Sequence, residues 1–175
     1  MINLENKNII LTGATGGIGN SIVDTKLYKW PQRKRILSGK IKEALNVYKI
    51  GKNNRGPSFG QDMYKVFGSS MITLNVHIDL ANNRAANIRL FEATGMGCCL
   101  LTDWKENISD YFIPEEEVVT FKSKSECLEK IKYLLDNPDL RKQIAEAGQK
   151  RTISCHTMEK RVNTLAKYIL TQNSF

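Results

Sequence analysis

One stretch of the sequence, residues 84–103, constrains the fold more than any other. Apolar residues recur at helical spacing over 85–94, Gly95 and Gly97 then interrupt the helix, and a short apolar strand is predicted at 98–102. A helix that ends on glycine and leads at once into a buried strand is typical of α/β proteins. The stretch therefore predicts a helix–strand unit of a parallel sheet.

The rest of the chain also alternates between predicted strands and helices. Further strands are expected at Ile9–Thr12, Leu45–Ile50, Met71–Val76 and Glu117–Phe121, and further helices at Gly19–Tyr28, Pro31–Glu43, Gln61–Phe67, 124–136, 139–152 and 157–171. Ser123 and Glu126 form a capping box before the helix at 124–136. The pattern predicts an α/β fold: a Rossmann-like, doubly wound parallel sheet in a single domain, with C-terminal helices.

A sheet of this kind binds ligands at the carboxyl ends of its strands. Asn75 and His77 follow one predicted strand, and Asn87 and Glu92 lie on the next helix, so these four side chains are expected around one crevice. Unpaired N–H groups at a helix start can bind phosphate, and a carboxylate one turn later can accept hydrogen bonds from a ribose diol.

A purely structural alternative is open for the same helix. Ala85, Ile88 and Phe91 would pack into the core, and Arg89 and Glu92 would form a surface ion pair. Spacing alone favours this alternative.

From about residue 61 the sequence resembles the C-terminal half of GT-B group 1 glycosyltransferases of the CgeB-like type. The resemblance rests on QDMYKVFGSSMITLNVHID, NIRLFEATGMGCCLLTD, DYFIPEEEVVTF and AEAGQKRTISCHTMEKRV, which occur in the order and at the spacing of that family. It is taken to extend over about residues 30–172. It implies a domain that binds a nucleoside diphosphate sugar as donor, without metal or further cofactor.

The resemblance implies roles for particular residues. Glu92 matches a glutamate expected to bind the nucleotide ribose, and Asn87 matches a position near the phosphates. The candidate nucleotide-sugar-binding residues are Asn75, His77, Asn87, Arg89, Glu92 and Gly95. Many retaining relatives carry a second glutamate where this chain has Arg84, so the stereochemical outcome stays open, and no catalytic base can be named. Acceptor binding belongs to an N-terminal domain that we do not recognise here, so transfer is expected only with a complementary acceptor domain, such as a separate chain.

Residues 1–29 resemble instead the start of a short-chain dehydrogenase/reductase. Gly13, Gly17 and Gly19 lie between a predicted strand and helix, where glycines allow a pyrophosphate to approach the backbone. The Tyr-x-x-x-Lys set of that family is missing at its expected distance. The sequence thus suggests a division of the chain into residues 1–29 and 30–175. Two alternatives to the glycosyltransferase interpretation follow: the chain is a fragment of an NAD- or NADP-dependent reductase, or it is a non-catalytic fusion remnant. The strand at 9–12 could equally be the first strand of the glycosyltransferase domain.

Charge and cysteine content set outer limits. The net charge is +8, and residues 26–55 carry ten Lys or Arg against one acid. This basic segment has three interpretations: a solvated helix face, donor phosphate binding by Arg33 and Arg35, or peripheral contact with anionic lipid. Nucleic-acid binding ranks last, because no recognised nucleic-acid motif accompanies the charge. Four cysteines without a C-x-x-C pair suggest reduced thiols and a cytoplasmic protein, with neither a zinc site nor a disulfide framework.

Overall fold

The computed structural model describes residues 9–12, 58–77 and 83–172 of the 175-residue chain. The described elements are β1 (Ile9–Thr12), α3 (Gly60–Gly68), β2 (Ile72–Asn75), α4 (Arg89–Gly95), β3 (Cys99–Asp103), a 3₁₀ turn η3 (Ile108–Asp110), β4 (Val119–Phe121), α5 (Lys124–Asp136), α6 (Pro138–Cys155) and α7 (Met158–Gln172). The helices expected at 19–28 and 31–43 and the strand expected at 45–50 lie outside the described residues.

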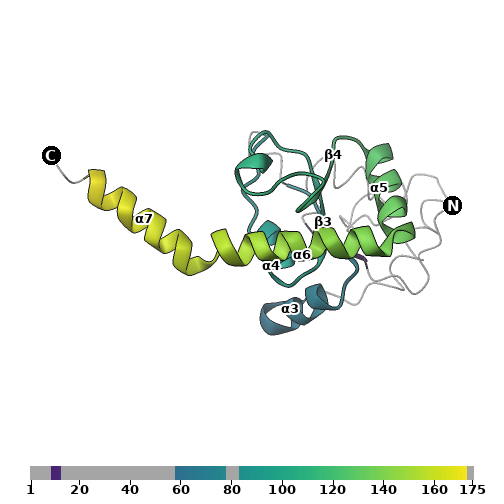
Figure 1. Cartoon of the computed structure of the whole chain (residues 1–175), viewed down its shortest axis with the longest axis horizontal. Helices are drawn as coiled ribbons and strands as arrows, with labels where there is room; N and C mark the ends of the chain where they lie inside the picture. The colour runs from purple at the N-terminus through teal and green to yellow at the C-terminus, as the bar shows by residue number, and fades with distance from the viewer. Residues whose placement is uncertain (1–8, 13–57, 78–82, 173–175) are drawn as a thin grey trace, which may run out of the picture.

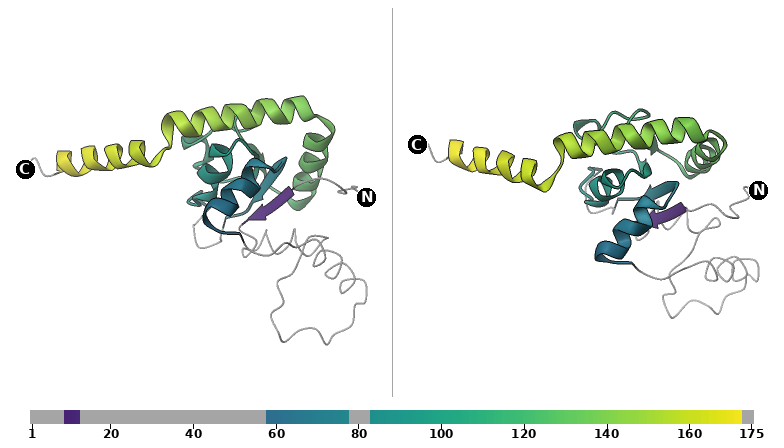
Figure 2. Two further views of the ribbon diagram at one scale, coloured as in Figure 1. Left: turned by 90° about the horizontal axis from the view of Figure 1, so that it is seen from below. Right: turned by 60° about the horizontal axis from the view of Figure 1, so that its bottom comes forward.

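The described strands form one parallel sheet in the order β1-β2-β3-β4. Ile9 is paired with Ile72, and Ile72 in turn with Cys99, so β1 is continuous with the strands that follow it. Figure 2 shows β1 lying beside β2 at one side of the sheet. The parallel sheet expected from alternating strands and helices is confirmed.

Helices cover both faces of the sheet, because alternate strand residues point to opposite sides. On one face, Leu74, Leu101 and Phe121 pack with residues of α5 and α6. On the other, Leu100 packs with residues of α3 and α4, such as Phe67 and Leu90. Figure 1 shows α6 crossing one side of the molecule while α3 lies on the other. These two layers make the Rossmann-like α/β arrangement that the sequence predicts.

The helix predicted to begin near residue 85 begins at Arg89 instead. The side chain of Asn107 holds the backbone of Ala85 from both sides: Asn107 Oδ1 accepts from the Ala85 amide at 2.6 Å, and Asn107 Nδ2 donates to the Ala85 carbonyl at 3.1 Å. The bond to the Ala85 carbonyl uses an acceptor that a helix starting there would need for the Arg89 amide. The purely structural alternative is wrong about Ile88, which it placed in the core, since Ile88 is 59% exposed.

α4 ends at the glycines, as predicted. Gly97 has φ +74°, a left-handed conformation that glycine adopts without strain. The amides of Gly97 and Cys98 then donate to the carbonyls of Thr94 and Ala93, closing the helix before β3 begins.

The C-terminal helices match their predicted starts closely. α5 covers 124–136 as predicted, with Ser123 Oγ accepting from the Glu126 amide at 3.2 Å. In a regular capping box the Glu126 carboxylate would accept from the Ser123 amide. Here it accepts from the amide of the preceding residue, Lys122. Pro138 occupies the first turn of α6.

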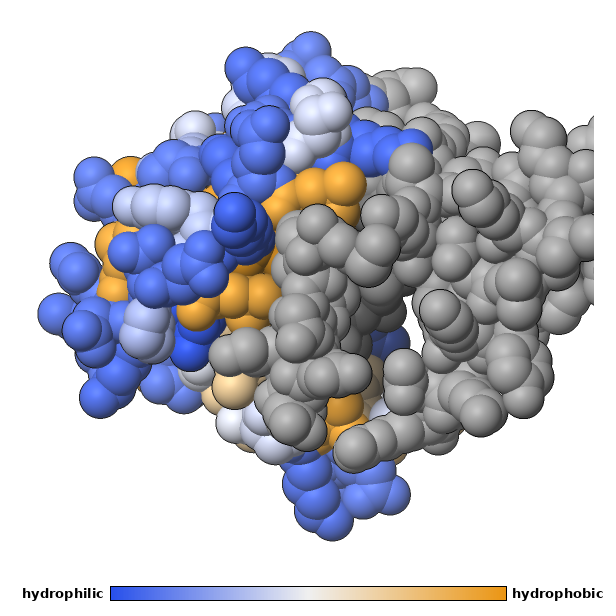
Figure 3. Space-filling view, turned by 90° about the vertical axis from the view of Figure 1, so that its right-hand side faces the viewer, coloured by the Kyte–Doolittle hydropathy of each residue, from blue (hydrophilic) through white to orange (hydrophobic). Residues whose placement is uncertain are grey.

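α7 continues from α6 and extends beyond the body of the protein (Figures 1 and 2). On the face that carries α5, the described residues are mostly hydrophilic, with apolar residues showing between them (Figure 3). None of the described helices combines the length and apolar composition needed to cross a membrane.

Candidate functional site

A chain of buried polar side chains links the carboxyl ends of β2 and β3. Asn87 Nδ2 donates to Asn75 Oδ1 at 2.9 Å, and Asn75 Nδ2 donates to Thr102 Oγ1 at 3.1 Å. Thr102 Oγ1 lies 3.4 Å from Asp103 Oδ1, which also accepts from His77. Three predicted site residues, Asn75, His77 and Asn87, are therefore joined through Thr102 and Asp103.

His77 and Asp103 form a buried, hydrogen-bonded pair at one end of this group of side chains. Asp103 Oδ1 accepts from the His77 backbone amide at 3.0 Å and contacts His77 Nδ1 at 2.7 Å. Both side chains are 1% exposed. Lys105 Nζ lies 3.1 Å from the other carboxylate oxygen, Oδ2, which accepts no hydrogen bond of good geometry among the described residues.

The charge of Asp103 is held in place by these neighbours. Burial by itself raises the pKa of the Asp103 carboxyl, but the hydrogen bonds and charge of His77, together with the Lys105 ammonium, outweigh it and lower that pKa below its ordinary value. Asp103 is consequently an ionised carboxylate at neutral pH, in a position to orient the His77 ring.

Glu92, the predicted ribose-binding residue, lies one turn into α4 with two intramolecular partners. Tyr64 Oη, on α3, donates to Glu92 Oε1 at 3.2 Å, and Arg89 Nη1 pairs with Glu92 Oε2. The Glu92 charge and this hydrogen bond raise the pKa of the Tyr64 phenol. The Arg89–Glu92 ion pair that the purely structural alternative predicts is therefore present. The Glu92 side chain is nevertheless 15% exposed.

Asn87 uses its side chain to cap α4. Its Oδ1 accepts from the Arg89 amide at 2.8 Å, and its carbonyl accepts from the Leu90 amide at 3.2 Å. The Phe91 amide donates to the Ile88 carbonyl. The first amides of α4 are therefore already bonded, and the expectation that a helix start near residue 85 offers unpaired N–H groups to phosphate is wrong for Arg89, Leu90 and Phe91.

Gly95 lies apart from the other candidates, at the opposite end of α4. Its carbonyl accepts from Gln149 Nε2, on α6, at 3.0 Å. The structure thus places Gly95 in the contact between α4 and α6 rather than at the carboxyl edge. Five further candidates, Arg33, Arg35, Gly13, Gly17 and Gly19, lie outside the described residues.

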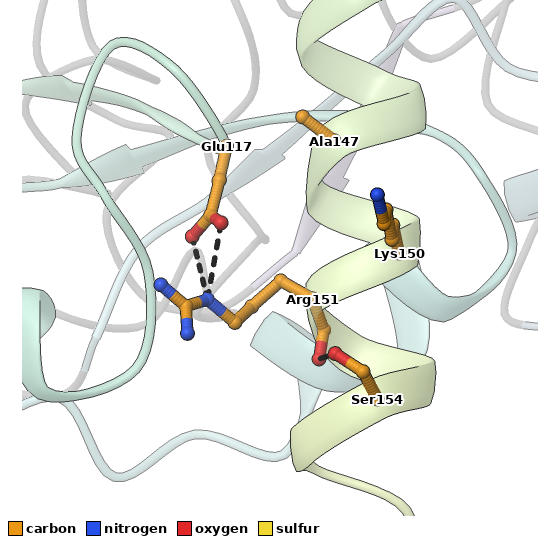
Figure 4. A pocket seen from close by; sticks show the side chains of 5 residues that line it. All are labelled: Glu117, Ala147, Lys150, Arg151 and Ser154. Carbon is orange, nitrogen blue, oxygen red and sulfur yellow. Dashed lines mark hydrogen bonds and ion pairs between the residues drawn. The ribbon is translucent and has the colours of Figure 1, made fainter.

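A separate depression of about 350 Å³ lies on the outer side of α6, lined by Glu117, Ala147, Lys150, Arg151 and Ser154 (Figure 4). Arg151 Nε donates to both oxygens of Glu117, at 3.0 and 2.9 Å, and the Ile113 amide donates to Glu117 as well. Glu117 precedes β4, so this depression is at the amino edge of the sheet. Glu117 and Arg151 pair with each other across it, and we assign this pair a structural role.

Sequence reasoning missed several members of the site. Asp103 comes directly after an apolar run, which was the available signal, but Tyr64 and Lys105 carry no local pattern that marks them. Across the part of the chain that the structure describes, no three His, Cys, Asp or Glu side chains are grouped so that they could hold a metal ion. The cysteines Cys98, Cys99, Cys127 and Cys155 are free thiols, and the first three are buried.

The fold, with its polar side chains at the carboxyl edge of the sheet, defines a parallel α/β domain of the Rossmann-like type. The sequence pattern of the family described as "Glycosyl transferase-like" matches residues 8–167. The chain therefore belongs to the glycosyl transferase-like family. A comparison with curated proteins finds no significant match.

Three solved structures have a similar fold. The C-terminal domain of a glycosyl transferase group 1 family protein (LpcC) from Francisella tularensis is 16% identical with TM-score 0.57, and the match covers 86% of this chain and 85% of that one. Sucrose-phosphate synthase from Thermosynechococcus elongatus is 14% identical with TM-score 0.65, covering 96% of this chain and 47% of that one. A glycosyltransferase from Rickettsia africae ESF-5 is 17% identical with TM-score 0.62, covering 97% of this chain and 49% of that one.

These findings bear on the two resemblances seen in the sequence. The chain spans about half the length of the sucrose-phosphate synthase and of the Rickettsia enzyme. The family match begins at residue 8, and β1 pairs with β2, so the first strand belongs to the glycosyltransferase-like sheet. The dehydrogenase resemblance gains no support, while the CgeB-like subtype and the boundary at residue 29 stay predictions.

Proposed function

We propose that this chain binds the nucleoside diphosphate sugar donor of a glycosyltransferase at the carboxyl edge of β2 and β3, with Glu92 as the ribose-binding residue. The observation that carries the proposal is the placement of the Glu92 carboxylate. It lies one turn into a helix that starts beside β2, and Tyr64 and Arg89 hold it from two sides.

A carboxylate held in this way suits a vicinal diol. Each carboxylate oxygen has two lone pairs, and in Glu92 each oxygen has one partner. One acceptor position on each oxygen is left for the two hydroxyls of a ribose. Because Tyr64 and Arg89 already orient the carboxylate, binding the diol orders little additional structure.

Asn75, His77, Asn87 and Arg89 complete the proposed donor site. Asn87 and Asn75 are hydrogen-bonded to each other, which supports a role in shaping the site beside the start of α4. The Arg89 side chain is 32% exposed and adds positive charge there, which favours a diphosphate. Transfer to an acceptor, in a cytoplasmic setting and without metal or a further cofactor, belongs to the proposal only for a protein that also supplies an acceptor-binding half.

Isothermal titration of the purified chain tests donor binding. UDP-glucose, GDP-mannose, UDP and GDP are titrated into the wild type, Glu92→Ala and Glu129→Ala, the last being an exposed glutamate on α5. Saturable binding that Glu92→Ala weakens by at least about tenfold, equivalent to about 1.4 kcal/mol, and that Glu129→Ala leaves unchanged, is expected. Binding of NADH or NADPH in place of all four nucleotides would overturn the proposal in favour of a reductase fragment.

A further inference from the structure

The imidazole of His77 has one nitrogen bonded and one buried without a partner. Nδ1 lies 2.7 Å from Asp103 Oδ1. Nε2 is buried and has no hydrogen-bond partner among the described residues. A buried polar atom without a partner costs free energy, and a hydrogen-bonding group supplied by a ligand would remove that cost.

The hydrogen bonds around Asp103 decide which nitrogen of His77 carries the proton. The pKa of Asp103 is lowered, so this carboxylate is ionised and can only accept hydrogen bonds. His77 Nδ1 must then be the donor in their contact. In neutral His77 the proton is on Nδ1, and Nε2 carries a lone pair and is the atom that can take up a second proton.

We propose that His77 is the proton-binding residue of the donor site: Nε2 takes up one proton when a diphosphate ligand binds, and the resulting N–H donates to an anionic oxygen of that ligand. This inference rests on the proposed function, because it assumes that a nucleotide diphosphate binds at the carboxyl edge. Asp103 is a positioning residue in this scheme, since it acts on the ligand only through His77.

The charges around His77 favour proton uptake when an anion is bound. Among the described residues, the charged groups of this cluster are Asp103, on β3, which contacts His77 Nδ1, and Lys105, in the segment after β3, which pairs with Asp103. Their charges cancel, so the cluster is neutral with neutral His77 and carries one positive charge when His77 is protonated. Asn75 and Thr102 contact the cluster through uncharged groups. A doubly negative diphosphate would stabilise the protonated cluster, whereas without it a buried positive charge is costly.

The experiment measures protons taken up on binding. UDP-glucose and GDP-mannose are the probes, because their diphosphates are esterified at both ends and lack the terminal phosphate ionisation that occurs near about pH 6. Each titration is repeated at one pH in buffers of different ionisation enthalpy, and the dependence of the observed enthalpy on the buffer gives the number of protons exchanged. The affinity is then followed over the same pH range.

The wild type should take up a proton, and its affinity should rise as the pH falls, by up to about tenfold per pH unit. His77→Gln should bind with an affinity that no longer depends on pH. The chain has two histidines, so His156→Gln is a matched control. His156 contacts the Tyr111 carbonyl through Nε2 at 2.9 Å, near the junction of α6 and α7, and its removal should leave proton uptake unchanged.

A measurement without ligand guards against a variant that fails to fold. In the free wild-type protein, nitrogen-15 NMR of the imidazole should show that the neutral form of His77 carries its proton on Nδ1, and Asp103→Asn should shift it toward the other tautomer. A proton on Nε2 in the free wild type overturns the inference. So does donor binding without proton uptake, or uptake that persists in His77→Gln, and in those cases the proposed function stands. If the wild type binds neither probe, nor UDP or GDP, the proposed function fails and this inference fails with it.

Discussion

Gly148 on α6 lies directly against the backbone carbonyl of Glu117, so closely that a Cβ at position 148 would overlap that oxygen. The contact brings α6 onto the segment that leads into β4. Neighbouring bonds fix the same junction, since Thr152 on α6 contacts Thr94 on α4, and Arg151 pairs with Glu117. Any side chain larger than the hydrogen of glycine at position 148 would therefore require the backbone of α6 or of Glu117 to shift.

Gly148→Ala should therefore destabilise the protein by about 1–3 kcal/mol, the typical cost of overpacking a core. Chemical denaturation followed by circular dichroism measures the change. Gly95→Ala is the matched control, because the nearest atom to its added Cβ would be Thr152 Cγ2 at 3.5 Å, an ordinary contact. Equal stability of the two variants would show that the Glu117 contact does not limit the packing of α6.

The hydrogen bond between Thr94 and Thr152 should couple α4 to α6 energetically. Their hydroxyl oxygens are 2.6 Å apart, and Thr94 Oγ1 also lies 2.6 Å from the Leu90 carbonyl, to which it donates. We expect Thr152→Val and Thr94→Val each to lower the free energy of unfolding by about 1 kcal/mol. In a double-mutant cycle, the double variant should be less destabilised than the sum of the two, because both changes remove the same bond. Strict additivity would contradict direct coupling.

Asp103 should make stability depend on pH at the acid end. Its pKa is lower in the folded protein than in the unfolded chain, so its contribution is fully present above the unfolded aspartate pKa of about 4 and is lost as the pH falls through the lower folded value. Asp103→Asn should be less stable than wild type at neutral pH, and this difference should shrink on acidification below about pH 4. Urea denaturation at several pH values tests this, with the exposed Asp110→Asn as control. A difference that does not change with pH would be inconsistent with an ionised Asp103.

Tyr64 should report on the Glu92 carboxylate. The negative charge of Glu92 raises the pKa of the Tyr64 phenol, so Glu92→Gln should lower that pKa toward the ordinary tyrosine value. NMR titration of carbon-13-labelled tyrosine measures it, with Tyr64→Phe to assign the signal. An unchanged Tyr64 titration would mean that the Tyr64–Glu92 contact is not maintained in solution.

Cys155 should be the fast-reacting thiol of the described chain. It is exposed, and the Ser154 hydroxyl and the Arg151 guanidinium lower its pKa, which favours the reactive thiolate. Burial raises the pKa of Cys98 to about 11 and those of Cys99 and Cys127 to about 12. Thiol titration with a disulfide reagent should show one rapid equivalent in the native protein and four after unfolding. Cys155→Ser should abolish the rapid phase, and a rapid phase that survives would assign it to another cysteine.

Elements with local signals were the easiest to predict. The bounds of α5 agree with the prediction because Ser123 and Pro138, one at each end, act on the backbone within a few residues. The break after α4 was also predictable, since Gly97 is needed for a positive φ. The start of α4 was not, because the residue that holds Ala85 out of the helix is Asn107, 22 positions further along.

The same division applies to the candidate site. Hydrophobic periodicity and glycine placement were sufficient to predict a parallel α/β sheet and to bring Asn75, His77 and Asn87 to one edge of it, since those signals act between near neighbours in the chain. Pairing His77 with Asp103 across 26 positions, and Tyr64 with Glu92 across 28, required the folded sheet and the packed helices. Such contacts depend on which strands become adjacent and on what burial excludes, and neither is encoded in a local pattern. Tertiary packing therefore decided that Asp103 is ionised, that it orients His77, and that His77 Nε2 is buried without a partner among the described residues.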